Sequence, residues 1–155
     1  MSNSETRYIY RAKELQMGKF VYGAYLKFLP YTPYPVGNGH IPETDYKHLI
    51  ITEGFSDWGL PRELRACEID VNTLEQCTGL KDKNGKAIYE GDVLKEENGK
   101  TYIVEWNSNH ATFFIERIEK IGYFDTWHLA RHDLDYEVIG NVHENPELYK
   151  GGSNE

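Results

Sequence analysis

Turn-forming residues divide this sequence into segments that are too short for long helices. From Pro30 to Pro42, proline and glycine recur so densely that neither a helix nor a central strand can persist. Further turn signals follow at Gly85, at Gly91 and at Asn98-Gly99. The runs between them are rich in Val, Ile, Tyr and Thr, which favour strands. The sequence therefore predicts a mainly β fold.

Asn98-Gly99 is the strongest hairpin signal in the chain. If these two residues form the whole turn, Leu94 lies opposite Ile103, and apolar side chains pair away from the turn. Further strand-like runs follow as far as Ile118. We therefore predict an antiparallel meander that curls into a small, SH3-like barrel.

Helical structure is expected only near the end of the chain. The segment 126–134 is predicted as a helix, because Trp127, Leu129 and Leu134 could form its packing side. Asn145-Pro146 resembles a cap followed by a helix-first proline, which predicts one short closing helical turn. We expect residues 1–66 to form a β-hairpin with a Pro/Gly-rich loop, 67–150 the barrel-like region, and 151–155 a disordered tail.

The charge balance bears on the class of partner. The net charge is −8, with +1 in residues 1–66 and −9 in residues 67–155. A surface that binds the phosphate backbone needs clustered Lys and Arg, so this balance disfavours nucleic acid. No apolar run is long enough for a membrane span, and no secretory signal is visible at Met1. We therefore expect a soluble protein of the bacterial cytoplasm in which Cys67 and Cys77 are free thiols.

Two segments have a recognisable sequence: Thr78 to Lys86, continued by Ile88 to Val93, and the ending from Tyr136 to Leu148. They resemble the YopX protein family, and the opening from Tyr8 to Ala12 resembles it more loosely. The resemblance implies a β-rich fold and a gene carried by bacteriophages or prophages of Gram-positive bacteria, but it implies no activity. The matching residues also have a structural interpretation, because Gly79, Gly85, Gly91 and Gly140 suit turns or bulges.

One group of side chains suggests a metal site. His128 and His132 are four residues apart in the predicted helix, and Asp125 precedes the first by three. In a helix these three side chains share one face, which suits a transition metal. The spacing also fits a solvated helix face, and no Glu completes a His-Glu-x-x-His motif. A metal-dependent enzyme is therefore kept as an alternative, and no cofactor is expected.

Three aromatic residues in loops are candidates for a binding surface. Tyr31 and Tyr34 lie in the proline-rich loop, and Trp58 lies in a second loop. The favoured hypothesis is a non-enzymatic phage or prophage accessory protein that binds another protein. A nucleic-acid-binding small barrel is the alternative, because aromatic strand faces can stack on bases. Homo-oligomerisation is left open by the sequence.

Overall fold

The computed structural model describes residues 8–32, 41–54, 56–119, 126–129 and 135–149. The chain forms two compact units, and the N-terminal unit spans Tyr8–Leu74. The described part of the other unit begins at Glu75. The domain boundary expected between Ala66 and Cys67 falls inside a strand, and the division between the units follows Leu74. Each unit has its own hydrophobic core.

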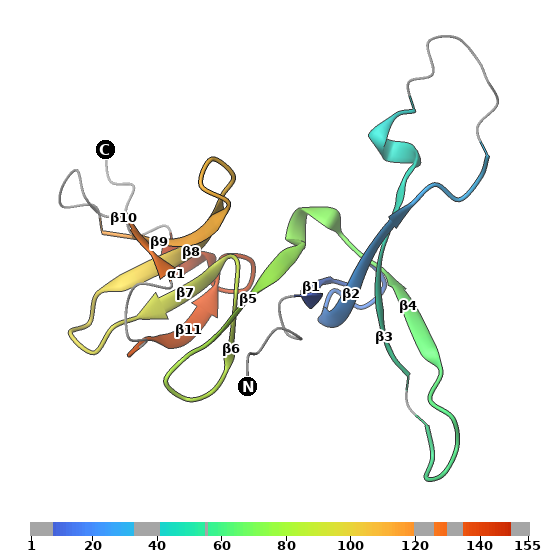
Figure 1. Cartoon of the computed structure of the whole chain (residues 1–155), viewed down its shortest axis with the longest axis horizontal. Coiled ribbons are helices and arrows are strands. Elements are labelled where there is room, and N and C mark those ends of the chain that lie inside the picture. Colours follow the sequence, from blue (N-terminus) through green and yellow to red (C-terminus); the bar gives the residue numbers. More distant parts are fainter. Residues whose placement is uncertain (1–7, 33–40, 55, 120–125, 130–134, 150–155) are drawn as a thin grey trace. The chain divides into compact units, whose positions relative to one another are not determined.

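The N-terminal unit is built on an antiparallel sheet. Its described elements are β1 (Tyr10–Lys13), β2 (Phe20–Phe28), β3 (Lys47–Glu53) and β4 (Leu64–Glu68), with short 3-10 helices η2 (Glu43–Asp45) and η3 (Val71–Thr73). The strands lie in the order β4-β3-β2-β1, so β3 and β4 form a long hairpin (Figure 1). The β1–β2 hairpin predicted from the sequence is present.

The core of this unit lies on one face of its sheet. Ala12 on β1 and Ile50 on β3 are fully buried, and Ile69 beyond β4 packs with them. Val21 and Tyr25 on β2 are packed against the same cluster. Because successive side chains of a strand point to opposite faces, the even-numbered residues of β2, from Phe20 to Phe28, point away from this core.

The C-terminal unit combines a hairpin with a second antiparallel sheet. The hairpin joins β5 (Glu75–Lys81) to β6 (Ala87–Tyr89). The sheet contains β7 (Asp92–Lys95), β8 (Thr101–Asn107), β9 (Thr112–Arg117), β10 (Thr126–His128) and β11 (Glu137–Asn141), and helix α1 (Pro146–Tyr149) follows it. Its strand order is β10-β9-β8-β7-β11 (Figure 1). The mainly β fold, the meander and the short closing helix are confirmed, and in the described residues the sheet is open rather than a closed barrel.

Both faces of this second sheet are covered. On one face, Leu94, Tyr102, Val104 and Ile115 are buried together with Ile88 of the hairpin. On the other face, Val93, Ile103 and Ile118 pack with Leu148 of α1 and nearby side chains. Strands β7 and β8 therefore contribute alternate residues to two different cores.

The turn between β7 and β8 corrects the predicted register by one residue. Leu94 lies opposite Tyr102, and Ile103 pairs with Val93 instead. The backbone amide of Glu96 donates to the carbonyl of Lys100 at 2.9 Å, so these two residues flank the turn. The turn therefore contains three residues, 97–99, rather than two. Gly99 takes a φ of 88°, which is typical of the last position in a three-residue hairpin loop. The extra residue changes which side chains share a face.

The helix predicted at 126–134 is wrong where its residues are described. Thr126–His128 is strand β10, which pairs with β9. Trp127 points inward and meets the Tyr102 ring edge-on at 5.8 Å, while Thr126 and His128 are exposed. Exposed and partly buried side chains therefore alternate from one residue to the next, which is the pattern of a strand rather than of a helix. Residues 130–134 lie outside the described residues.

Candidate functional site

Trp58 lies at the tip of the β3–β4 hairpin, and its side chain is fully exposed. The backbone amide of Leu60 donates to the carbonyl of Asp57 at 3.1 Å, which closes a four-residue turn. Gly59, the third residue of that turn, has a φ of 80°. A type II turn needs this conformation, and glycine adopts it at little cost. We call Asp57–Leu60 the Trp58 tip.

A second hydrogen bond lies below the Trp58 tip. The amide of Gly54 donates to the carbonyl of Glu63 at 2.7 Å, which closes the base of the loop. Arg62 forms an ion pair with Glu53 at the end of β3. Leu60, the last residue of the same turn, is also exposed. An indole and an aliphatic side chain are therefore held outward on a hydrogen-bonded loop with charged residues around them.

Tyr31, the second candidate, is placed at the opposite end of the same sheet. It follows β2, and its hydroxyl donates to Asp45 Oδ2 of η2 at 2.5 Å. This hydrogen bond raises the pKa of the Tyr31 hydroxyl. The length of β3, about 20 Å at ~3.3 Å per residue, separates the two ends. The structure therefore does not bring Tyr31 and Trp58 together, and Tyr34 lies outside the described residues.

The metal hypothesis can be compared with the structure only in part. His128 lies on β10, and its ring is tilted against that of Phe114 with centroids 4.3 Å apart. Asp125 and His132 lie outside the described residues. The helical spacing behind the hypothesis is absent at His128, because that residue is in a strand. Among the described side chains, no three from His, Cys, Asp and Glu are grouped to hold a metal ion.

Sequence reasoning missed a polar cluster around Tyr25. The Tyr25 hydroxyl lies 2.7 Å from His48 Nδ1, and His48 Nε2 lies 3.8 Å from Glu43 Oε1. Lys27 contacts the same glutamate oxygen at 2.5 Å. Burial raises the pKa of the Tyr25 hydroxyl, which keeps it protonated and able to donate. Tyr25 and Lys27 are two residues apart on β2 and therefore share a face, and His48 on β3 lies opposite Lys27. The alternation of side chains along β2 is the sequence signal that could have found this cluster.

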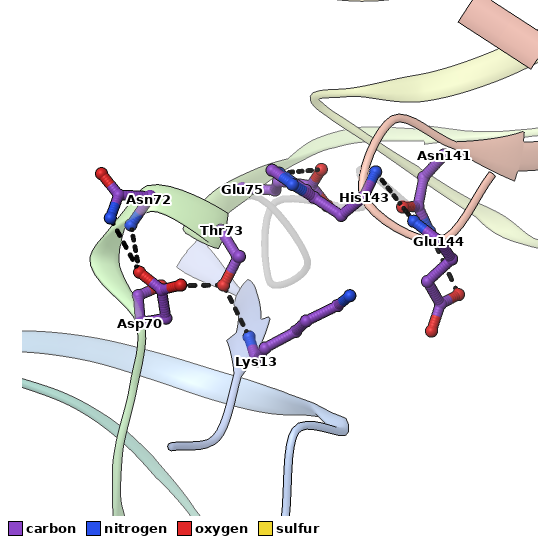
Figure 2. A network of polar contacts seen from close by, with 8 residues as sticks. All are labelled: Lys13, Asp70, Asn72, Thr73, Glu75, Asn141, His143 and Glu144. Atoms are coloured by element: carbon purple, nitrogen blue, oxygen red, sulfur yellow. Dashed lines mark hydrogen bonds and ion pairs between the residues drawn. The ribbon is translucent and has the colours of Figure 1, made fainter. Parts of the chain in front are cut away.

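Two further polar groups hold short structural elements in place (Figure 2). In the N-terminal unit, Asp70 accepts from the amide of Asn72 at 3.0 Å and so caps η3. Thr73 Oγ1 accepts the backbone amide of Lys13 at 2.8 Å, which ties η3 to β1. These contacts use backbone groups, and they are explained by folding.

The second group lies in the C-terminal unit. Asn141 Oδ1 accepts the backbone amides of His143 and Glu144 at 2.9 Å each, which fixes the turn after β11. His143 Nε2 lies 3.5 Å from Glu75 Oε1, a carboxylate that is almost fully buried. Gly91, with a φ of 75°, sits against the same oxygen, because a Cβ there would come within 2.3 Å. The group therefore explains why this position is a glycine.

The glycines and caps singled out from the sequence have structural roles of the same kind. Gly85 has a φ of 82° and closes the turn that begins at Asp82. Gly140 lies at a bulge of β11, where a Cβ would approach Asn145 Oδ1 to 2.5 Å. Pro146 opens α1. These residues specify the fold rather than a chemical site.

Comparison with known proteins shows the family of this chain. The YopX protein family matches residues 9–150. The chain belongs to the YopX family. The crystal structure of protein EF1440 from Enterococcus faecalis is similar at 24% identity, covering 91% of this chain and 96% of that one, with a TM-score of 0.49. No curated protein matches the chain. In the described part of this YopX-family chain, no helix is both long and apolar enough to cross a bilayer.

Proposed function

We propose that this chain is a non-enzymatic binding module, a phage or prophage accessory protein that attaches to another protein through the Trp58 tip. The observation that carries the proposal is the full exposure of Trp58 on a closed, hydrogen-bonded turn. A large ring exposed to water is costly, and tryptophan is the side chain most enriched among the residues that dominate binding energies. Folding alone does not account for its position.

The surroundings of the ring support a protein as the partner. Leu60 adds exposed aliphatic surface on the same turn, and the exposed Asp57, Arg62 and Glu63 supply charges of both signs along the loop. An apolar centre with a polar rim is the usual arrangement of a protein–protein interface. Because the hydrogen bonds of the turn already order the loop, binding would cost little further backbone entropy.

The test is affinity capture of the tagged full-length protein from a lysate of a phage-carrying bacterium, with and without nuclease. We expect a stoichiometric protein that survives nuclease, is lost with Trp58→Ala and is retained with Tyr149→Ala. Tyr149 is the matched control because it is an exposed aromatic residue of the other unit. Retention of the captured protein by Trp58→Ala would contradict the role of the tip. Capture that disappears with nuclease would favour the nucleic-acid alternative.

A further inference from the structure

A second apolar surface covers the sheet of the N-terminal unit on the side away from its core. We call it the outer face, and it consists of Tyr22, Ala24, Leu26 and Phe28 on β2, Leu49 and Ile51 on β3, and Leu64 and Ala66 on β4. These residues alternate with the core residues of the same strands. Leu26 is 44% exposed and Leu64 is 76% exposed. A contiguous apolar surface of this kind marks an interaction site.

The outer face is complementary to itself when each strand is read backwards. On β3, the residues pointing outward run acid, apolar, apolar, base, from Glu53 through Ile51 and Leu49 to Lys47. On β2 the outward residues begin at Phe20, whose ring lies under Arg11 and Lys13. The remaining four, from Tyr22 to Phe28, read aromatic, apolar, apolar, aromatic. The observed register aligns the two strands, since Ala24 lies opposite Ile51 and Phe28 lies opposite Lys47. Both patterns are therefore centred at the same level of the sheet.

We propose that the outer face is the interface of a homodimer in which two copies pack sheet on sheet around a two-fold axis that crosses the strands. Such an axis places β3 over β3 and reverses its direction. Glu53 then faces Lys47 of the second copy, and Ile51 faces its Leu49. On β2, Tyr22 faces Phe28 of the second copy. A two-fold interface must be self-complementary, and this surface meets that condition.

The side-chain sizes and spacing fit this packing. Facing sheets lie about 10 Å apart, a gap that two apolar layers fill and that a glutamate and a lysine can bridge. The small Ala24 of one copy comes opposite the larger Leu26 of the other, so the two layers can interdigitate. Burial of the apolar centre supplies the stability, and the charges at the two ends set the orientation.

The net charge of the N-terminal unit does not oppose pairing with a second copy. Residues 8–74 carry 7 Lys+Arg and 8 Asp+Glu, a net charge of −1, so two copies of this unit do not repel one another appreciably. Within one chain, Glu53 already pairs with Arg62 at one end of the strip, and Lys47 pairs with Glu68 at the other. The two-fold arrangement brings these pairs together as four-charge clusters at the rim. This interface does not depend on the Trp58 tip.

The first experiment measures the mass of the full-length protein in solution by sedimentation velocity over a wide concentration range. We expect a dimer that dissociates on dilution, and a monomer throughout for Leu26→Glu. Leu15→Glu is the matched control, because Leu15 is an exposed leucine of the same unit in the turn between β1 and β2. This variant should dimerise normally. A wild-type monomer at every concentration, or a dimer that Leu26→Glu leaves intact, would overturn the proposal.

A charge exchange tests the orientation itself. Lys47→Glu places acid opposite Glu53 of the second copy, and Glu53→Lys places base opposite its Lys47. Because the symmetry repeats the change at both ends, each single variant should weaken dimerisation roughly tenfold. The double variant restores opposite charges across the interface and should recover the wild-type dissociation constant. If the double variant loses as much free energy of dimerisation as the two single variants together, this arrangement is rejected. Circular dichroism checks that all variants remain folded.

Discussion

At the residue scale, Asp82 connects two segments of the C-terminal unit. Its Oδ1 accepts the backbone amides of Asn84 and Lys86 at 2.8 and 2.9 Å, and its Oδ2 accepts that of Val138 at 3.1 Å. Burial opposes ionisation of this carboxyl, but the three amide donors outweigh it and hold the pKa of Asp82 below its usual value. The side chain thus links the turn after β5 to β11 in the sheet.

We therefore expect Asp82→Asn to reduce the free energy of unfolding by about 2–3 kcal/mol at neutral pH, because an amide presents an NH₂ group to a backbone donor. Urea unfolding followed by circular dichroism measures this loss. Because folding lowers the pKa of Asp82, the extra stability of the wild type over Asp82→Asn is fully present above the pKa of an aspartate in the unfolded chain. This extra stability is lost as the pH falls through the lowered pKa of Asp82 in the folded protein. Asp70→Asn is the control, since asparagine caps as well as aspartate, and an equal loss there would contradict the explanation.

At the element scale, the turn between β6 and β7 depends on glycine for two separate reasons. Gly91 has a φ of 75°, and a Cβ there would come within 2.3 Å of the buried Glu75 carboxylate and 3.2 Å of Val142. Gly99 has a similar φ of 88°, but a Cβ there would meet nothing within 4 Å. The two positions therefore separate backbone strain from crowding.

Gly99→Ala should cost about 1–2 kcal/mol, the strain of placing alanine in the left-handed region. Gly91→Ala should cost at least about 2 kcal/mol more, because the buried Glu75 side chain must also move away from His143. Thermal unfolding of both variants checks this difference. Equal losses would mean that the Glu75–His143 contact does not hold the turn in place.

The elements also show what local sequence can predict. Turn chemistry located Gly85, Gly91 and the Asn98-Gly99 hairpin, because these residues favour positive φ in any context. It missed the register by one residue, since loops of two and three residues share the Asn-Gly signal. The segment at Trp127 was interpreted as a helix because a short apolar pattern fits both periods, and pairing with β9 decided between them.

The candidate site was predicted less completely, for a related reason. Trp58 is a candidate from the sequence because it is an aromatic residue in a turn-rich loop, and the structure shows that it is exposed, while its binding role stays a prediction. The outer face was not identified, because its residues come from three strands and look like core until the register is known. The cluster around Tyr25 and His48 was missed for the same reason, since residues on neighbouring strands meet only after the sheet has formed.

At the scale of the whole molecule, the charge is divided unequally between the units. Residues 75–155 carry 9 Lys+Arg and 16 Asp+Glu, a net charge of −7, whereas residues 8–74 carry −1. An acidic surface repels phosphates, and the near-neutral unit has no excess of cations to release counterions from a duplex. We therefore propose a protein, rather than nucleic acid, as the partner of the aromatic residues exposed on the N-terminal sheet.

This division predicts that the full-length protein does not bind a short DNA duplex or a single-stranded oligonucleotide, even at low ionic strength. Fluorescence anisotropy of labelled oligonucleotides, followed by a salt titration, measures this binding.

Binding with a steep salt dependence would show that basic side chains are locally concentrated despite the net charge, and it would favour the nucleic-acid-binding alternative. Binding that salt does not weaken would instead indicate stacking, and Trp58→Ala should then abolish it. An unchanged anisotropy at the lowest salt leaves protein recognition through the Trp58 tip as the function that the charges and the exposed side chains support together.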